Sequence, residues 1–155
     1  MKNDSLMNSK TNSQLIADMQ DKFGVIEWVA DKMEQGDYET VKEFIKFRVD
    51  VQLREELEET SDAVAQGNPE EIVDGLIDIL VFAYGTLDLL GVDADESFGR
   101  VTEANMAKEP GIKAGRPNPW GLPDLIKPEG WQSPSHINNH GILPLVYKAE
   151  SEIKW

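Results

Sequence analysis

Closely spaced carboxylates occupy two short stretches of this sequence. The first, "LREELEET" at residues 53–60, places four glutamates within five consecutive positions. The second, "VDGLIDILVFAYG" at residues 73–85, sets Asp74 and Asp78 inside an otherwise apolar run. At 100° per residue, Asp74 and Asp78 lie about 40° apart on a helix, so their side chains share one face.

Asp78 is the carboxylate with the strongest case for a chemical role. An unpaired buried carboxylate is costly, so a residue surrounded by apolar neighbours needs a partner for its charge. Residues 55–99 contain no lysine or arginine. A cation from solution is the natural partner, and hard cations such as Mg²⁺ bind carboxylate oxygens while keeping waters for substrate phosphates.

The alternative for each acid is an ordinary structural role. A glutamate-rich stretch such as "EELEE" is more often a solvated helix face than a set of metal ligands. Asp74 could be stabilised by the positive N-terminal end of its helix. For Asp78, which is flanked by Ile77 and Ile79, we favour the functional interpretation.

Hydrophobic periodicity predicts four helices that would position these acids. Apolar residues at helical spacing from Leu15 to Met33 predict the first helix, which Gly36 ends. "TVKE" at residues 40–43 has the spacing of a capping box and predicts a second helix over about 41–66. The third helix is expected over about 69–90, and the fourth, capped by Asp93 or Asp95, ends near Lys108.

The connection "QGNP" predicts how the two acid-bearing helices meet. Gly67 can adopt the left-handed conformation after a helix, Asn68 can cap the next helix, and Pro69 suits its first turn. Because this connection is short, the two helices should pack antiparallel. Their acids can then face each other across the bundle.

The composition indicates one acidic, cysteine-free domain of modest size. The 155 residues are 40% hydrophobic, and acids outnumber bases 29 to 15, which gives a formal charge of −14. This charge argues against nucleic-acid binding. No apolar run reaches the roughly 20 residues that span a bilayer, and no signal-peptide pattern opens the chain. We therefore expect a cytoplasmic protein without membrane or nucleic-acid partners.

The last third of the chain differs from the rest. Residues 109–155 hold seven of the eight prolines and three of the four tryptophans. Helices cannot persist through such a composition, yet Trp120, Trp131 and Leu143 need burial. An ordered arm and a loose tail are both consistent with this pattern. The expected organisation is a disordered arm (1–13), a helical catalytic domain (14–108) and a C-terminal extended arm (109–155).

Taken together, these motifs resemble the all-α nucleoside triphosphate pyrophosphohydrolases, the MazG-like and phosphoribosyl-ATP pyrophosphohydrolase-like group. "EELEE" is similar to the group's EExxE motif, and the run from "VDGLIDILVFAYG" to "NMAK" is similar to its second half. "KPEGWQSP" resembles a tail seen in phage and bacterial members. The resemblance implies a MazG-like four-helix bundle with an irregular Pro/Trp-rich arm, and a Mg²⁺-dependent enzyme, with Mn²⁺ as an alternative ion, that releases pyrophosphate from a nucleoside triphosphate.

The resemblance also implies roles for individual residues. Carried over by position, Glu56 and Glu59 are the ExxE metal ligands, and Asp78 is the last residue of an ExxD motif. Gly75 stands where ExxD has its glutamate, so the match departs from the pattern there. We prefer Asp74 and Asp78 as ligands, although Glu71 with Asp74 also satisfies ExxD and Glu71 would otherwise be an outer acid.

Other side chains are candidates for catalysis and for substrate binding. A carboxylate at the rim, Glu55 or Glu56, is a reasonable general base. Asn105 and Lys108 lie one turn apart and could hold phosphate, sugar or base groups, although Lys108 would also suit a helix C-terminus. Arg48, on the predicted face of Glu55 and Glu59, could reach a phosphate or simply pair with those glutamates.

Three functions remain open at the level of sequence. The first is a nucleoside triphosphate pyrophosphohydrolase, the second is a phosphoribosyl-ATP pyrophosphohydrolase of histidine synthesis, and the third is a non-catalytic helical interaction module. Acids in an apolar helix favour the enzymes, because a scaffold has no reason to bear their cost. The long aromatic tail favours the first. Many apolar positions also predict a homodimer or a higher homo-oligomer, with sites near the subunit interface.

Overall fold

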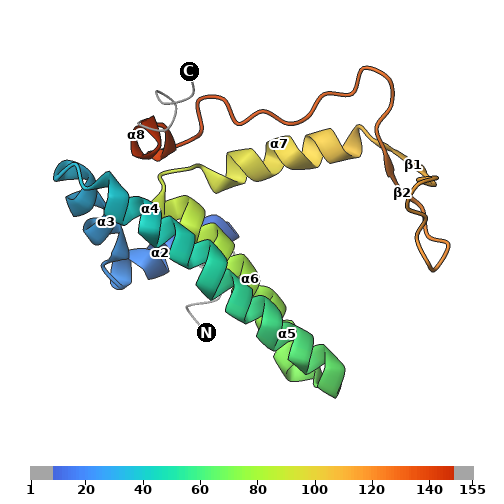
Figure 1. Cartoon of the computed structure of the whole chain (residues 1–155), viewed down its shortest axis with the longest axis horizontal. Coiled ribbons are helices and arrows are strands. Elements are labelled where there is room, and N and C mark those ends of the chain that lie inside the picture. Colours follow the sequence, from blue (N-terminus) through green and yellow to red (C-terminus); the bar gives the residue numbers. More distant parts are fainter. Residues whose placement is uncertain (1–8, 149–155) are drawn as a thin grey trace. The chain divides into compact units, whose positions relative to one another are not determined.

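The computed structural model describes residues 9–148, and helices make up most of them (Figure 1). The all-α fold class expected from the sequence is therefore confirmed. The chain divides into two compact units. Within the described residues, the first unit contains 9–94 and 140–148, and the second contains 95–139.

The first unit is entirely helical and carries both acidic stretches. It contains α2 (Asn12–Lys22), α3 (Val25–Glu34), α4 (Tyr38–Phe47), the π-helical segment η1 (Arg48–Leu53), α5 (Arg54–Gln66), α6 (Pro69–Leu89) and the short α8 (Leu143–Val146). Helix α5 packs along α6, and α2 and η1 also contact α6. Figure 1 shows α5 and α6 side by side as a long hairpin.

The second unit combines a helix with a small antiparallel hairpin. It contains most of α7 (Ala94–Met106), followed by β1 (Glu109–Gly111) and β2 (Asp124–Ile126). The two strands pair with Glu109 opposite Ile126. No strand was expected from the sequence, because three-residue strands are too short to show an alternating pattern.

The single first helix predicted over Leu15 to Met33 is wrong, because the structure divides it into α2 and α3. The break falls at Gly24, whose φ of 68° is left-handed. A left-handed residue ends one helix, and glycine adopts this conformation without steric cost. Phe23, expected on the apolar face, is 63% exposed at this break.

The predicted start of the second helix is also wrong. Helix α4 begins at Tyr38, and its N-cap is Asp37, whose side chain accepts a hydrogen bond from the Thr40 backbone N–H at 3.3 Å. Thr40 therefore lies inside the first turn and does not open the helix with a capping box. At the fourth helix, Asp95 lies inside α7, which begins directly after Asp93.

The turn between the acid-bearing helices has the predicted chemistry. Gly67 ends α5 with a left-handed φ of 63°, and Asn68 caps α6 by accepting from the Glu71 backbone N–H at 3.3 Å. Pro69 occupies the first turn of α6. These local signals are confirmed because each depends only on the backbone geometry of adjacent residues.

The C-terminal arm has different environments along its length. Val146 in α8 is only 1% exposed, and the Ile142 backbone N–H donates to the Leu90 carbonyl at 2.8 Å. Trp131 is half-buried. Trp120 is 82% exposed, so the described residues of this chain do not bury it. It follows a loop with two prolines that leaves the indole without covering side chains.

Two further expectations concern the chain's ends and membranes. The predicted disordered arm (1–13) lies outside the described residues up to residue 8, and α2 begins at Asn12. Within residues 9–148, no single helix has the length and apolar composition to cross a membrane, and α6 and α7 reach that composition only when counted together.

Candidate active site

Thr60 and Gly75 set how α5 and α6 meet. Thr60 is buried, and its hydroxyl donates to the Glu56 carbonyl at 2.6 Å. A Cβ at Gly75 would overlap Thr60 Oγ1 and lie 3.1 Å from Thr60 Cβ. The absence of a side chain at Gly75 therefore lets the two helices approach closely.

This crossing point determines which acids become neighbours. In antiparallel helices, residues one turn before Thr60 face residues one turn after Gly75. Glu56 on α5 is thereby placed opposite the turn of α6 that carries Asp78. Neither Thr60 nor Gly75 was expected to set this packing, although a lone glycine inside an apolar helix is a signal of close packing.

The pKa of the Glu56 carboxyl reflects the acids that surround it. Burial, and then repulsion from Asp78, Glu59, Asp74 and Glu55 in that order, raises the pKa of the Glu56 carboxyl above its ordinary value. Five carboxylates proposed as base or metal ligands therefore share one electrostatic neighbourhood. Glu56 and Asp78 are half-buried, whereas the other three are exposed.

No cation offsets this charge within residues 9–148. None of the five carboxylates forms an ion pair with a described side chain, and Arg54, which precedes them, donates instead to the Asp50 carbonyl at 3.0 Å. Like charges held together in this way repel and favour any cation that binds between them.

The acidic group supplies carboxylate oxygens, which hard cations prefer as ligands, but it does not form a complete coordination site. Among the described residues, no group of three or more His, Cys, Asp or Glu side chains stands in an arrangement that could hold a metal ion. Mg²⁺, however, is commonly bound by only one or two carboxylates and completes its shell with waters and substrate phosphates. Carboxylates on facing helices, with Asp78 and Glu56 at the centre, match that donor set.

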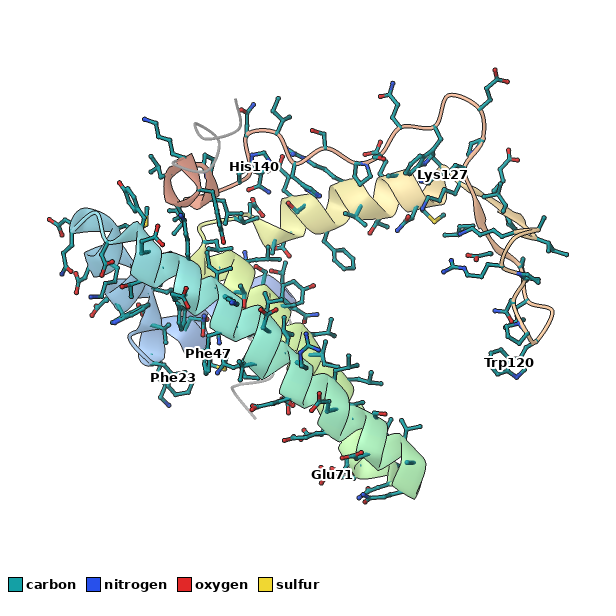
Figure 2. All side chains as sticks on the ribbon, in the orientation of Figure 1. Phe23, Phe47, Glu71, Trp120, Lys127 and His140 are labelled. Carbon is teal, nitrogen blue, oxygen red and sulfur yellow. The ribbon has the colours of Figure 1, made fainter. Side chains whose placement is uncertain are left out.

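Glu71 lies apart from this group. It is exposed in the first turn of α6, near the tip of the α5–α6 hairpin (Figure 2). It is not among the charges that raise the pKa of Glu56. Its position agrees with that of an acid at the N-terminal end of a helix, where the dipole favours negative charge.

Arg48 is buried, and its surroundings differ from those expected. It is 8% exposed, with its guanidinium 5.6 Å from the Phe44 ring centroid and 5.4 Å from that of Phe82. Its Nη1 donates to Gln52 Oε1 at 3.4 Å, and Nε has no hydrogen-bond partner within residues 9–148. Burial lowers the pKa of the guanidinium, although Arg remains charged at neutral pH.

The predicted common face of Arg48, Glu55 and Glu59 is wrong, and η1 explains why. A π turn closes with i→i+5 hydrogen bonds and holds one more residue than an α turn, so later residues rotate by about 100°. Glu55 and Glu59 consequently point to solvent while Arg48 points into the core. The same rotation turns Glu56 and Thr60 toward α6.

Asn105 and Lys108 belong to the second unit. Lys108 Nζ donates to Asn105 Oδ1 at 3.0 Å, and both side chains are half-buried. Helix α7 ends at Met106, so Lys108 lies just beyond the helix rather than on it. The structure thus pairs the two residues that were predicted to bind substrate.

Comparison with known proteins gives one match. Residues 26–105, which are 80 of the chain's 155 residues, match the family model described as phosphoribosyl-ATP pyrophosphohydrolase. The matched range includes every carboxylate of the group around Glu56, together with Arg48 and Asn105. Among curated protein sequences, no significant match was found.

Proposed function

Because this chain belongs to the phosphoribosyl-ATP pyrophosphohydrolase family, whose members cleave phosphoric anhydride bonds, we propose that it hydrolyses a nucleoside triphosphate to the monophosphate and pyrophosphate. One observation supports the site most directly. Burial, together with four carboxylates from α5 and α6, raises the pKa of Glu56. An enzyme that handles polyphosphate needs such acids to hold the cations that accompany its substrate.

The proposed metal ligands are Glu56, Glu59, Asp74 and Asp78. The ion proposed is Mg²⁺, with Mn²⁺ as a substitute, because both prefer carboxylate and water oxygens. When bound, the ion supplies positive charge that stabilises the phosphate oxygens and the leaving pyrophosphate. The electrostatic grouping of Asp74 and Asp78 with Glu56 supports this pair over Glu71 with Asp74.

The chain's own side chains can supply the proton transfer. The attacking water must lose a proton, and a carboxylate with a raised pKa is the stronger base. This favours Glu56, which is half-buried and has a raised pKa, over Glu55, which is exposed. Arg48, Asn105 and Lys108 are proposed to bind substrate groups, with Arg48 the least accessible of the three.

Two substrates remain in competition. The family description supports phosphoribosyl-ATP as the alternative, since the match covers the whole acidic pair of helices. Residues 106–148, which hold the hairpin and α8, lie beyond the matched range. This additional structure supports a ribo- or deoxynucleoside triphosphate as the first choice.

The test is a direct assay of products. The protein is incubated with Mg²⁺ and either a panel of ribo- and deoxynucleoside triphosphates or phosphoribosyl-ATP, and the products are separated by chromatography. Asp78→Asn should abolish release of pyrophosphate. Asp62→Asn, a matched change at an exposed acid of α5, should leave the rate unchanged.

Each outcome of this assay decides between the candidates. Turnover of phosphoribosyl-ATP alone would establish the second substrate. Diphosphate plus phosphate as products, or full activity in Asp78→Asn, would contradict the proposed site. A chain that binds Mg²⁺ and turns over nothing in the panel would support an interaction module.

We also propose that the chain forms a homodimer. Helix α6 exposes a stripe of large apolar side chains on the side opposite Gly75. Its members are Val73 (63% exposed), Leu76 (53%), Ile77 (51%) and Leu80 (47%). Such a stripe is typical of a helix that packs against a second copy of itself.

A further inference from the structure

In the second unit, the register of the hairpin brings two lysines together. Glu109 pairs with Ile126 at the end of the antiparallel ladder. One position further in the same register, Lys108 stands opposite Lys127. Residues directly opposite in an antiparallel pair have Cβ atoms only about 5 Å apart, and like charges placed there are destabilising.

The ammonium groups of both lysines contact the ring of Trp131. Lys108 Nζ lies 4.9 Å and Lys127 Nζ lies 5.0 Å from the centroid of the Trp131 ring. The indole is itself fixed, because its Nε1 donates to the Ala104 carbonyl in α7 at 2.7 Å. Lys108, Lys127 and Trp131, here termed the lysine pair, are thus positioned by the hairpin and α7 together.

The two positive charges have no acidic partner among the described residues 9–148. Nearby, Lys113 and Arg116 share Asp124 at 3.4 and 4.0 Å, so basic side chains of this hairpin can find carboxylates. Lys108 and Lys127 form no such pair. Contact with an aromatic ring at a solvent-accessible site contributes only about 0.5–1 kcal/mol per cation, and it leaves the charges unneutralised.

The positive charges of Lys108 and Lys127 favour the binding of an anion. Lys108 also donates to Asn105 Oδ1, which leaves the Asn105 amide N–H groups as further donors. Two ammonium groups and an amide are donors suited to phosphoryl oxygens. Lys108, Asn105 and Trp131 are half-buried, and Lys127 is exposed.

We propose that the lysine pair is a phosphate-binding site, which takes the phosphoryl oxygens of a nucleotide or of inorganic pyrophosphate. Lys127 and Trp131 lie outside the residues that match the family. Lys108 and Lys127 contact the anion, and Trp131 positions them. The identity of the anion rests on the proposed function, whereas the existence of the site rests on the contacts of Lys108, Lys127 and Trp131.

The experiment measures binding without turnover. The full chain is titrated calorimetrically with inorganic pyrophosphate in the absence of divalent cations. Parallel titrations use a nucleoside monophosphate and sulfate. Preference for pyrophosphate would indicate the leaving group as the ligand, and preference for the monophosphate would indicate the nucleotide.

Four variants assign the binding to the proposed residues. Lys127→Ala should raise the Kd by about tenfold, since it removes one charge-assisted contact. Lys127→Arg should restore most of the affinity, because it retains the charge. Lys113→Ala, a lysine of the same hairpin that already pairs with Asp124, should bind as the wild type does. Trp131→Phe should weaken binding less than Lys127→Ala.

A spectroscopic signal identifies where the anion binds. Pyrophosphate should shift the indole N–H resonance of Trp131, which is assigned by its disappearance in Trp131→Phe. Absence of saturable pyrophosphate binding, or equal affinity in Lys127→Ala and the wild type, would overturn the lysine pair. Asp78→Asn should bind pyrophosphate normally under these conditions, so failure of the proposed hydrolysis and failure of this site are distinguishable.

Discussion

Glu56 is the residue at which the acidic group has its strongest physical effect. Its ionised form is disfavoured by burial and by four neighbouring carboxylates, so its pKa in the folded protein exceeds that in the unfolded chain. Above the folded pKa, the charged carboxylate therefore destabilises the fold. As the pH falls through that pKa, protonation relieves the repulsion, and below the unfolded value the penalty is absent.

Glu56→Gln should consequently stabilise the metal-free protein at neutral pH. The expected result is a higher melting temperature at pH 7, with a gain that shrinks as the pH falls and disappears below about pH 4. Thermal denaturation followed by circular dichroism across this range measures it. The control is Glu58→Gln, at an exposed glutamate of the same helix. An equal gain in both variants, or a gain independent of pH, would contradict the assignment.

The same repulsion predicts how the protein responds to Mg²⁺. A cation that binds the folded form only should raise the melting temperature in proportion to its occupancy. The wild type should respond more strongly than Asp78→Asn, because that variant lacks a proposed ligand. Sodium chloride at matched ionic strength separates binding from general screening. Equal shifts with the two salts would argue against a specific site.

At the scale of elements, the close approach of α5 and α6 depends on the absence of a side chain at Gly75. Thr60 is branched at Cβ, so its side chain cannot easily rotate away from a new methyl group. The structure leaves no space for one there. The packing that brings Glu56 to Asp78 is therefore sensitive to a single methyl group.

Gly75→Ala should destabilise the protein by about 1–3 kcal/mol, as overpacking of a close contact does. It should also lower the rate of hydrolysis, because the acids of α5 and α6 are forced apart. Urea denaturation and the product assay measure the two effects. Gly99→Ala in α7 is the matched control: its new Cβ meets nothing within 4 Å, so a neutral or slightly stabilising effect is expected. Similar effects at both glycines would exclude the steric explanation.

The π-helical segment η1 also affects which residues of α5 face α6. Deletion of Val51, which is 38% exposed, should let η1 close as an ordinary α-helix. Because the π turn already accommodates one extra residue, the later residues of α5 should stay on the same faces after the deletion. Thr60 should keep its contact with Gly75, and Glu56 should still face α6.

The expected outcome of this deletion is that hydrolysis and most of the thermal stability are retained, because the faces of α5 are unchanged. Val51→Ala removes most of the same side chain without changing the register, and it should retain activity and most of the stability. The comparison requires only the product assay and a melting curve for each variant. A deletion variant without activity would contradict this account and show that the π turn itself is required.

At the scale of the whole molecule, the chain combines a segment that matches the family with further structure beyond the matched range. The matched range ends at residue 105, and the hairpin of the second unit follows it. The family part supplies the acidic helices α5 and α6. The part beyond it supplies Lys127 and Trp131, and so offers positive charge in a chain with a formal charge of −14.

The proposed homodimer belongs to this scale. Leu76→Glu should place a charge within the exposed stripe of α6 and shift the protein toward the monomer, because burying an unpaired carboxylate at an interface is unfavourable. Sedimentation velocity over a range of concentrations measures the change. Ile112→Glu, at a residue of the second unit that is 75% exposed, controls for the added charge. A wild type that sediments as a monomer at all concentrations would refute the dimer.

The sequence alone determined the features that depend on neighbouring residues. The turn at Gly67, Asn68 and Pro69, the bounds of α6 and the shared face of Asp74 and Asp78 all follow from hydrogen bonds and side-chain spacing within a few residues. Such features are visible as caps and as a repeat of 3.6 residues. For the same reason, the fold class and the helices that carry the acids could be predicted before any contact was known.

Only the tertiary structure decided how distant segments align. The extra residue of η1 leaves no mark in the hydrophobic pattern, and it reversed the expected relation of Arg48 to Glu55 and Glu59. Likewise, nothing in the sequence indicates that Lys108 and Lys127 stand opposite each other. Register between segments is fixed by the fit of side chains such as Thr60 against Gly75, and that fit exists only once both segments are in place.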